Sequence, residues 1–139
     1  MNENPEVRRI LFLDSNYENV NAFRNKASNL SCPVFIVAAS KTASAIDLLE
    51  HNDFDLIVSQ VYPTSVINGI GIVERLRKGC FGEQNKDIPV IAYTLQGFAD
   101  LDIYFKAGFN KYVAAPDNGN KLLRVIEKLL VLQDVEVMS

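Results

Sequence analysis

The chain has 139 residues, of which 48% are hydrophobic, 9% aromatic and 22% charged. This profile suits one soluble globular domain, which we expect to span residues 1–139 and to need no metal or disulfide support. The formal net charge of −3 argues against nucleic-acid binding. The apolar runs are too short for a membrane span, and the first residues lack the layout of a secretion signal. Two cysteines, Cys32 and Cys80, suit the reducing cytoplasm, where we expect the protein to act.

The first apolar run is residues 10–13, a continuous pattern that is typical of a strand covered on both faces of a sheet. It ends at Asp14. Ser15 and Glu18 then have the spacing of a capping box, which predicts a helix from there to about residue 29.

A central strand is predicted at residues 55–60, after a second strand at 34–38 and a helix capped by Ser40 or Thr42. Its apolar core runs to a polar end at Gln60. In open sheets of parallel strands, ligands and chemistry gather at the carboxyl edge of the strands. The side chain that this strand delivers to that edge is therefore a neutral amide.

The second half of the chain continues the alternation of helices and strands. We expect a helix from Gly69 to Gly79, a polar loop at 82–87, a strand at 89–94, a helix at 98–106, a strand at 111–114 and a helix at 121–132. Five strands that alternate with five helices through short connections predict an α/β fold with a parallel sheet and helices on both faces.

Several short segments, none specific by itself, occur in the order and near the spacing of one protein family. They are Ile10-Leu11-Phe12-Leu13-Asp14, Asp55-Leu56-Ile57-Val58, Asn68-Gly69, Leu76-Arg77, Pro89-Val90-Ile91-Ala92-Tyr93-Thr94, Ala107-Gly108, Tyr112-Val113 and Ala115-Pro116. Through them, about residues 8–131 resemble the receiver domain of bacterial two-component response regulators. The resemblance implies a flavodoxin-like, doubly wound (βα)5 sandwich of three layers with strand order 2-1-3-4-5.

In that family an aspartate that ends the third strand accepts a phosphoryl group, and two acidic residues after the first strand help it to hold Mg²⁺. A Ser or Thr after the fourth strand and a lysine after the fifth contact the phosphoryl group. The matching positions are Gln60 for the acceptor, Asp14 and Ser15 for the acidic pair, Thr94 for the hydroxyl and Ala115 for the lysine. An amide cannot form an acyl phosphate, and Mg²⁺ needs hard oxygen ligands. The resemblance therefore implies a degenerate receiver, or pseudo-receiver, with weak or absent Mg²⁺ binding.

Each of these positions also has a purely structural interpretation. Asp14 is either a remnant of the acidic pocket or a polar residue at a strand-to-helix turn. Ser15 is expected to cap the helix rather than to bind a ligand. Thr94 matches the family's switch hydroxyl but also fits a β-branched residue at a strand end. Tyr112 lies where the family has a rotating aromatic, and a packed strand aromatic is the simpler expectation.

In the family, the surface of the fourth helix, fifth strand and fifth helix contacts partners and dimerises. In the predicted fourth helix, Phe98, Leu101 and Phe105 share one face, which we assign to the core. Ile103 and Tyr104 fall off that face and are candidate contact residues. The resemblance implies a kinase or an output protein as the partner, with a homodimer as an alternative, and neither nucleic acid nor membrane.

The expected function is signal transduction through protein–protein interaction, without aspartyl phosphorylation and without catalysis. A sensor of small molecules that uses the neutral pocket around Asp14, Gln60 and Thr94 is the alternative. An enzyme of flavodoxin-like fold is disfavoured because the sequence offers no catalytic Cys–His pair, no metal cluster and no phosphate loop.

Overall fold

A computed structural model describes residues 7–61, 66–94, 101–114 and 120–138, with side chains described as far as residue 133. The strands are β1 (Arg8–Leu13), β2 (Val34–Ala39), β3 (Leu56–Gln60), β4 (Val90–Thr94) and β5 (Lys111–Ala114). The helices are α1 (Tyr17–Ala27), α2 (Thr42–His51), α3 (Gly69–Arg77), α4 (Glu83–Lys86), α5 (Asp102–Ala107) and α6 (Asn120–Met138).

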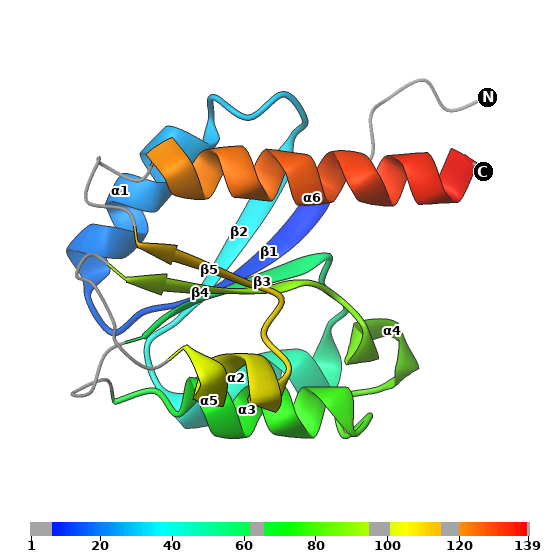
Figure 1. Ribbon diagram of the computed structural model, residues 1–139. Coiled ribbons are helices and arrows are strands. Elements are labelled where there is room, and N and C mark those ends of the chain that lie inside the picture. Colours follow the sequence, from blue (N-terminus) through cyan, green and yellow to red (C-terminus); the bar gives the residue numbers. More distant parts are fainter. Residues whose placement is uncertain (1–6, 62–65, 95–100, 115–119, 139) are drawn as a thin grey trace.

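The strands form one parallel sheet in the order β2-β1-β3-β4-β5. Helices α1 and α6 cover one face of this sheet, and α2, α3, α4 and α5 lie on the other (Figure 1). The predicted flavodoxin-like, three-layer α/β fold with strand order 2-1-3-4-5 is confirmed. Within the described part of the chain, none of the helices combines the length and apolar character that crossing a bilayer requires.

The core consists of two apolar layers, one on each face of the sheet. Every residue of β3 is buried, as expected for a central strand whose side chains meet helices on both faces. One layer packs β1, β3 and β4 against α2, α3 and α5, and includes Leu76. The other packs the same strands against α1 and α6, with Phe12 stacked on Phe23 at 4.4 Å between ring centroids. Burial of each large apolar side chain contributes about 1.5–3 kcal/mol, so these layers hold the helices on the sheet.

Two local predictions, for residues 82–87 and for the start of α2, were wrong. The expected polar loop at 82–87 contains the short helix α4, which follows Gly82 at a φ of 93°. Neither Ser40 nor Thr42 caps α2, since Lys41 occupies the N-cap position without a side-chain cap bond. The Thr42 hydroxyl instead accepts a hydrogen bond from the backbone N–H of Asn68 at 2.9 Å, which ties α2 to the start of α3.

The Asn68-Gly69 pair fixes the start of α3 against β3. Asn68 caps the helix, because its Oδ1 accepts a hydrogen bond from the Gly71 N–H at 3.0 Å. A Cβ at Gly69 would lie 2.9 Å from Ser59 Oγ, so a larger residue would push the helix off the strand. Ser59 thus faces α3, and strand alternation turns Gln60 toward the opposite face of the sheet.

Candidate functional site

Gln60 ends β3 at the carboxyl edge of the sheet and is buried, with 6% of its surface exposed. Asp14 directly follows β1, is 2% exposed, and adjoins Gln60 because β1 and β3 pair with Leu13 opposite Ser59. The structure therefore brings together Asp14 and Gln60, two of the three residues that the sequence placed around the neutral pocket.

The Asp14 carboxylate is surrounded by neutral hydrogen-bond donors. Its Oδ1 accepts from the backbone N–H of Asn16 at 2.8 Å, and its Oδ2 accepts from Asn19 Nδ2 at 3.1 Å. The Gln60 amide is oriented with its nitrogen toward Asp14, since this places a donor opposite the carboxylate oxygens. In this orientation Gln60 also donates to the carboxylate. Asn19 Nδ2 lies 3.1 Å from the Gln60 side-chain amide. Three neutral groups thus occupy the space around the carboxylate.

Asn19 was not predicted from the sequence as part of the site. It lies in the first turn of α1, one helical turn before the buried Phe23, so it reaches the sheet side of the helix. A polar residue at that spacing on an otherwise apolar helix face is the signal that could have identified it.

Burial raises the pKa of Asp14 above the ordinary value for an aspartate, and its hydrogen bonds to Asn16 and Asn19 oppose that shift. A carboxyl group with a raised folded-state pKa favours folding most when it is protonated. Its contribution to stability is present below the unfolded-state pKa and is lost as the pH rises through the folded-state pKa.

We therefore expect Asp14→Asn to stabilise the protein at neutral pH by about 1 kcal/mol, because it removes a buried charge. The asparagine oxygen still accepts from the Asn16 N–H, and Gln60 can turn its amide oxygen toward the new amide nitrogen and toward Asn19 Nδ2. The stability difference between variant and wild type should grow as the pH rises from acid to neutral and then level off. Urea unfolding at a series of pH values measures it. A variant that is less stable than wild type at neutral pH would contradict this interpretation.

Ser15 does not cap α1. Asn16 holds the N-cap position, and its Oδ1 accepts a hydrogen bond from the Glu18 N–H at 2.9 Å, while Ser15 is exposed. Serine and asparagine are equally good caps, so the sequence pattern alone could not choose between neighbouring positions. In the structure Ser15 is neither a cap nor a member of the buried pocket.

The remaining predicted positions lie on the last two strands. Thr94 ends β4 and is buried. Tyr112 is half-buried on β5 and packs against the core layer that contains α3 and α5. Ala115 and Phe98 lie outside the described residues.

The residues of the pocket do not fit a Mg²⁺ ion. Among the described residues, no three His, Cys, Asp or Glu side chains gather closely enough to hold a metal. Asp14 is the one carboxylate identified in the pocket, and the Asn19 and Gln60 amides face it as donors rather than as oxygen ligands. Mg²⁺ prefers several hard oxygen ligands in octahedral geometry, and this donor set lacks them.

We expect Gln60→Asp alone to leave Mg²⁺ binding weak, because Ser15 still supplies no carboxylate. The matched double variant Ser15→Asp/Gln60→Asp should bind Mg²⁺ roughly tenfold more tightly or better. Isothermal titration calorimetry of both variants tests this expectation. Tight binding by the single variant would show that Asp14 and one added carboxylate suffice.

The predicted contact residues of α5 are corrected in part. Ile103 is 46% exposed, as predicted. Tyr104 is 7% exposed and packs edge-on against Phe109 with 5.4 Å between ring centroids, whereas Phe105, assigned to the core, is 45% exposed. The short helix presents Tyr104 and Ala107 to the core, which rotates its apolar face from the expected position.

No protein-family model and no curated protein matches the chain. Solved structures match its fold. A CheY-like receiver domain protein from Methanospirillum hungatei is 22% identical with a TM-score of 0.73, over 94% of this chain and 99% of that chain. The receiver domain of a Pseudomonas aeruginosa sensor histidine kinase, solved with magnesium in its active-site cleft, is 21% identical with a TM-score of 0.71, over 89% and 98%. The chemotaxis response regulator CheY4 of Vibrio cholerae is 17% identical with a TM-score of 0.70, over 89% and 99%. The chain has the receiver fold.

Proposed function

We propose that this chain is a degenerate receiver domain that acts in signal transduction by binding other proteins and is not phosphorylated at the end of β3. The observation that supports this proposal is Gln60, buried at the carboxyl end of β3 and bonded to Asp14. A carboxamide has no anionic oxygen to attack a phosphoryl donor, so the position that this fold uses for an acceptor carries no nucleophile.

The side-chain amides also stabilise the buried carboxylate, as a bound cation would in a pocket with several carboxylates. Asn19 and Gln60 donate to the buried Asp14 carboxylate, which compensates part of its desolvation without a metal. Because Asn19 and Gln60 both direct an amide nitrogen at Asp14, these two donors are taken up within the site and are not left for a small ligand. This arrangement supports a binding module over the alternative of a small-molecule sensor.

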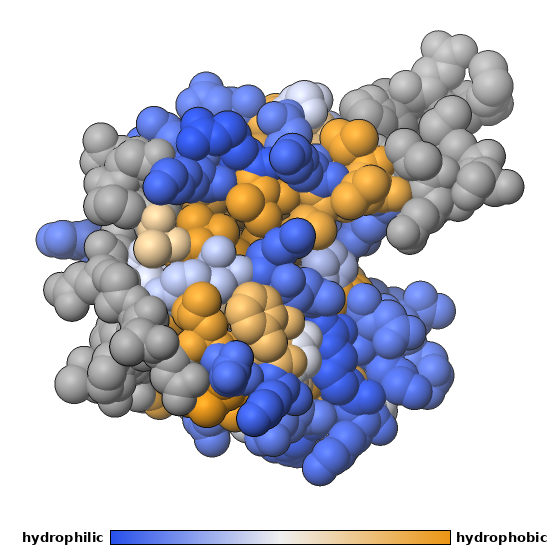
Figure 2. All heavy atoms as spheres, in the orientation of Figure 1, coloured by the Kyte–Doolittle hydropathy of each residue, from blue (hydrophilic) through white to orange (hydrophobic). Residues whose placement is uncertain are grey.

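The candidate partner surface is formed by α5, β5 and α6. Ile103 and Phe105 are exposed on α5, and apolar groups appear over both α5 and α6 on this face of the molecule (Figure 2). Exposed apolar residues of this kind suit protein–protein contact. A receiver-like role implies one of three partners: a kinase, an output protein or a second copy of the chain.

The decisive test is incubation with Mg²⁺ and a small acyl-phosphate donor, followed by mass spectrometry of the intact protein. We expect no added phosphoryl group, since Gln60 cannot form an acyl phosphate. A receiver with an intact acceptor aspartate, treated in parallel, shows that the donor is active. A stoichiometric adduct that hydroxylamine removes would refute the proposal.

A further inference from the structure

The strand β2 is an edge of the sheet. It pairs with β1 on one side, and no described strand pairs with its other side. Its six residues include neither a charge nor a proline, the residues by which edge strands commonly avoid pairing with another chain. The other edge strand, β5, has four residues and begins with the exposed Lys111. Of the two edges, β2 is therefore the better suited to accept an added strand.

The backbone of β2 presents alternate residues to this open side. The Arg8 N–H donates to the carbonyl of Pro33, directly before β2, at 3.0 Å, so the odd-numbered residues of this segment face β1. The even-numbered residues 34, 36 and 38 consequently direct their N–H and C=O groups away from β1. An extended segment of another chain can pair with these groups as the next strand of the sheet.

A groove of about 520 Å³ runs beside this edge, between β2 and the end of α1. Leu30, Val34 and Ile36 line part of it and are each half-buried. Arg24, which is exposed, is the one charged side chain among the described residues that line the groove. Its Nη2 donates to the Ile36 carbonyl at 3.3 Å, a long bond to a neutral acceptor. A carboxylate is a stronger acceptor for a guanidinium than such a carbonyl.

The opposite face of β2 is apolar. Strand alternation turns Phe35 and Val37 toward the α2 side of the sheet, where Val37 packs against the core layer that contains α2. Phe35 is 56% exposed. A strand paired with β2 would therefore meet an aromatic ring on one face of the sheet and a cation in a partly apolar groove on the other.

We infer that β2 binds an extended segment of a partner protein, with an acidic residue opposite Ile36 and an apolar residue on each side of it. The apolar residues pack on Phe35 and Val37, and the carboxylate binds Arg24. When Arg24 turns to this carboxylate, the Ile36 carbonyl is released to accept an N–H of the added strand. Main-chain bonds then supply affinity, and the alternate side chains supply specificity.

The inference rests on the proposed function, because both make the chain a module that binds other proteins. It goes beyond that function by assigning a second surface, at the edge of the sheet opposite β5, and by naming the chemistry of the segment that it takes.

The charge at this edge disfavours other occupants. Two copies paired antiparallel through Ile36 would bring their Arg24 side chains together on one face of the joined sheet, and like charges in that position oppose pairing. A nucleic acid has no peptide backbone to pair with β2 and would meet a molecule of net charge −3.

The test uses a fluorescein-labelled peptide of nine residues in which threonine alternates with valine and the central threonine is replaced by glutamate. Fluorescence anisotropy measures its binding to the full chain. Arg24→Glu should bind it at least about tenfold more weakly than wild type. The same variant should prefer a peptide with lysine in place of glutamate, the reverse of the wild-type order. Phe35→Ser should weaken binding roughly fivefold through loss of apolar contact.

Pairing through the backbone has its own signature. Two further peptides carry N-methyl groups on alternate residues, one on the valines and the other on the threonines and the glutamate. One of them should lose binding and the other should bind within about twofold of the parent peptide, since a strand presents alternate N–H groups to its neighbour. Amide hydrogen exchange at Ile36, followed by NMR, should slow at least about tenfold at saturating peptide. Equal binding of the two methylated peptides, or unchanged exchange at Ile36, would overturn the inference.

Matched controls make the same substitutions elsewhere. Arg75→Glu changes an exposed arginine of α3, and Phe105→Ser changes a phenylalanine of α5 that is 45% exposed. We expect both to bind the peptide as wild type does, and thermal melts establish that each variant is folded. If the controls lost as much affinity as Arg24→Glu and Phe35→Ser, or if all four bound equally well, the β2 edge would not be the binding site.

A homodimer in light scattering that Phe35→Ser dissociates would assign the edge to a second copy and would also overturn the inference. These experiments are independent of the acyl-phosphate test, since the β2 variants leave Asp14 and Gln60 unchanged. A phosphorylated protein would refute the proposed function, whereas a protein that does not bind the peptide would refute the role of the β2 edge alone.

Discussion

Replacement of Arg77 by methionine is expected to lower the free energy of unfolding by roughly 3–5 kcal/mol. In the native protein, Arg77 Nε and Nη2 donate to the Gly108 carbonyl at 3.1 and 2.9 Å. Nη2 also donates to Asn110 Oδ1 at 2.7 Å. Its Nη1 donates to the carbonyls of Lys86 and Ile88, both at 2.8 Å. One guanidinium therefore joins the end of α3 to α4, to the start of β4 and to the α5–β5 turn.

The geometry of the guanidinium, rather than its charge, is expected to decide the effect. Arg77→Lys keeps the charge but cannot present donors in a planar fork, so it should lose most of the same stability. Burial lowers the pKa of Arg77, because desolvation penalises the charged guanidinium, while the nearby Asp87 carboxylate opposes that shift. Urea unfolding followed by circular dichroism gives the measurement.

Arg75→Met is the matched control. Arg75 is exposed on α3, with its guanidinium 5.3 Å from the centroid of the Phe81 ring, and its loss should cost less than about 1 kcal/mol. Equal losses for Arg75→Met and Arg77→Met would mean that the network around Arg77 contributes little.

The position of Arg77 also explains why residue 108 is a glycine. Gly108 has a φ of 119°, a conformation that other residues rarely adopt, and a Cβ there would lie 2.6 Å from Arg77 Cγ. A glycine directly after a helix favours a left-handed cap, and the sequence alone indicates that much. It could not predict the close contact with a side chain from α3, because that contact depends on tertiary packing.

The strands could be predicted because each is a short apolar run with polar or proline boundaries, and their order followed from the family resemblance. Gln60 and Asp14 could be placed together because parallel strands end at one edge of the sheet. Asn19 could not be assigned to this site from the sequence, because its position depends on how α1 is rotated against the sheet. Tyr104 was misplaced for the same reason, since a short helix offers too few apolar residues to fix its buried face.

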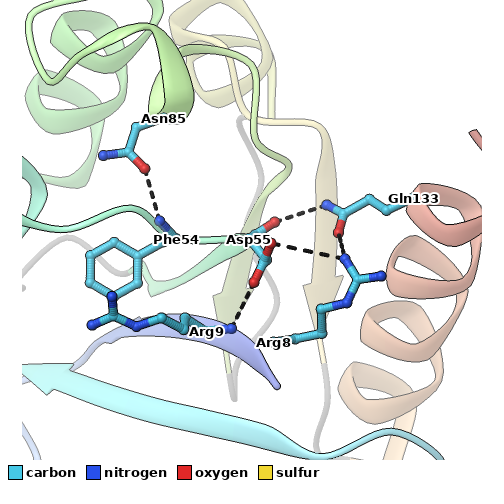
Figure 3. Close-up of polar contacts among 6 residues, drawn as sticks. All are labelled: Arg8, Arg9, Phe54, Asp55, Asn85 and Gln133. Atoms are coloured by element: carbon cyan, nitrogen blue, oxygen red, sulfur yellow. Dashed lines mark hydrogen bonds and ion pairs between the residues drawn. The ribbon is translucent and has the colours of Figure 1, made fainter. Parts of the chain in front are cut away.

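A polar network joins side chains at the amino edge of the sheet, opposite the edge that carries Asp14 and Gln60 (Figure 3). Asp55 Oδ2 accepts from the Arg9 N–H at 2.8 Å, and the Asp55 carbonyl accepts from Gln133 Nε2 at 2.9 Å. Arg8 Nη1 donates to Gln133 Oε1 at 2.9 Å and lies 3.9 Å from Asp55 Oδ1. These bonds hold the second half of α6 against the starts of β1 and β3.

Asn85, fully buried in α4, is the other position where a large effect is expected. Its Oδ1 accepts from the Phe54 N–H at 2.9 Å, as Figure 3 shows. Its Nδ2 donates to the carbonyls of Leu49, Asn52 and Phe81 at 3.1, 2.8 and 3.2 Å. This amide thus closes the end of α2, the start of β3 and the turn before α4 around one side chain.

Asn85→Leu should lower the free energy of unfolding by roughly 3–5 kcal/mol, because it leaves a buried N–H and several carbonyls without this partner while nearly keeping the side-chain volume. Gln84→Leu changes the exposed neighbour on the same helix and should shift stability by less than about 0.5 kcal/mol. Urea unfolding of both variants separates lost hydrogen bonds from a general intolerance of leucine in α4. If Asn85→Leu were as stable as wild type, the Asn85 hydrogen bonds would not be needed to hold α4. Apolar packing would then have to explain why the polar segment 82–87 forms a helix.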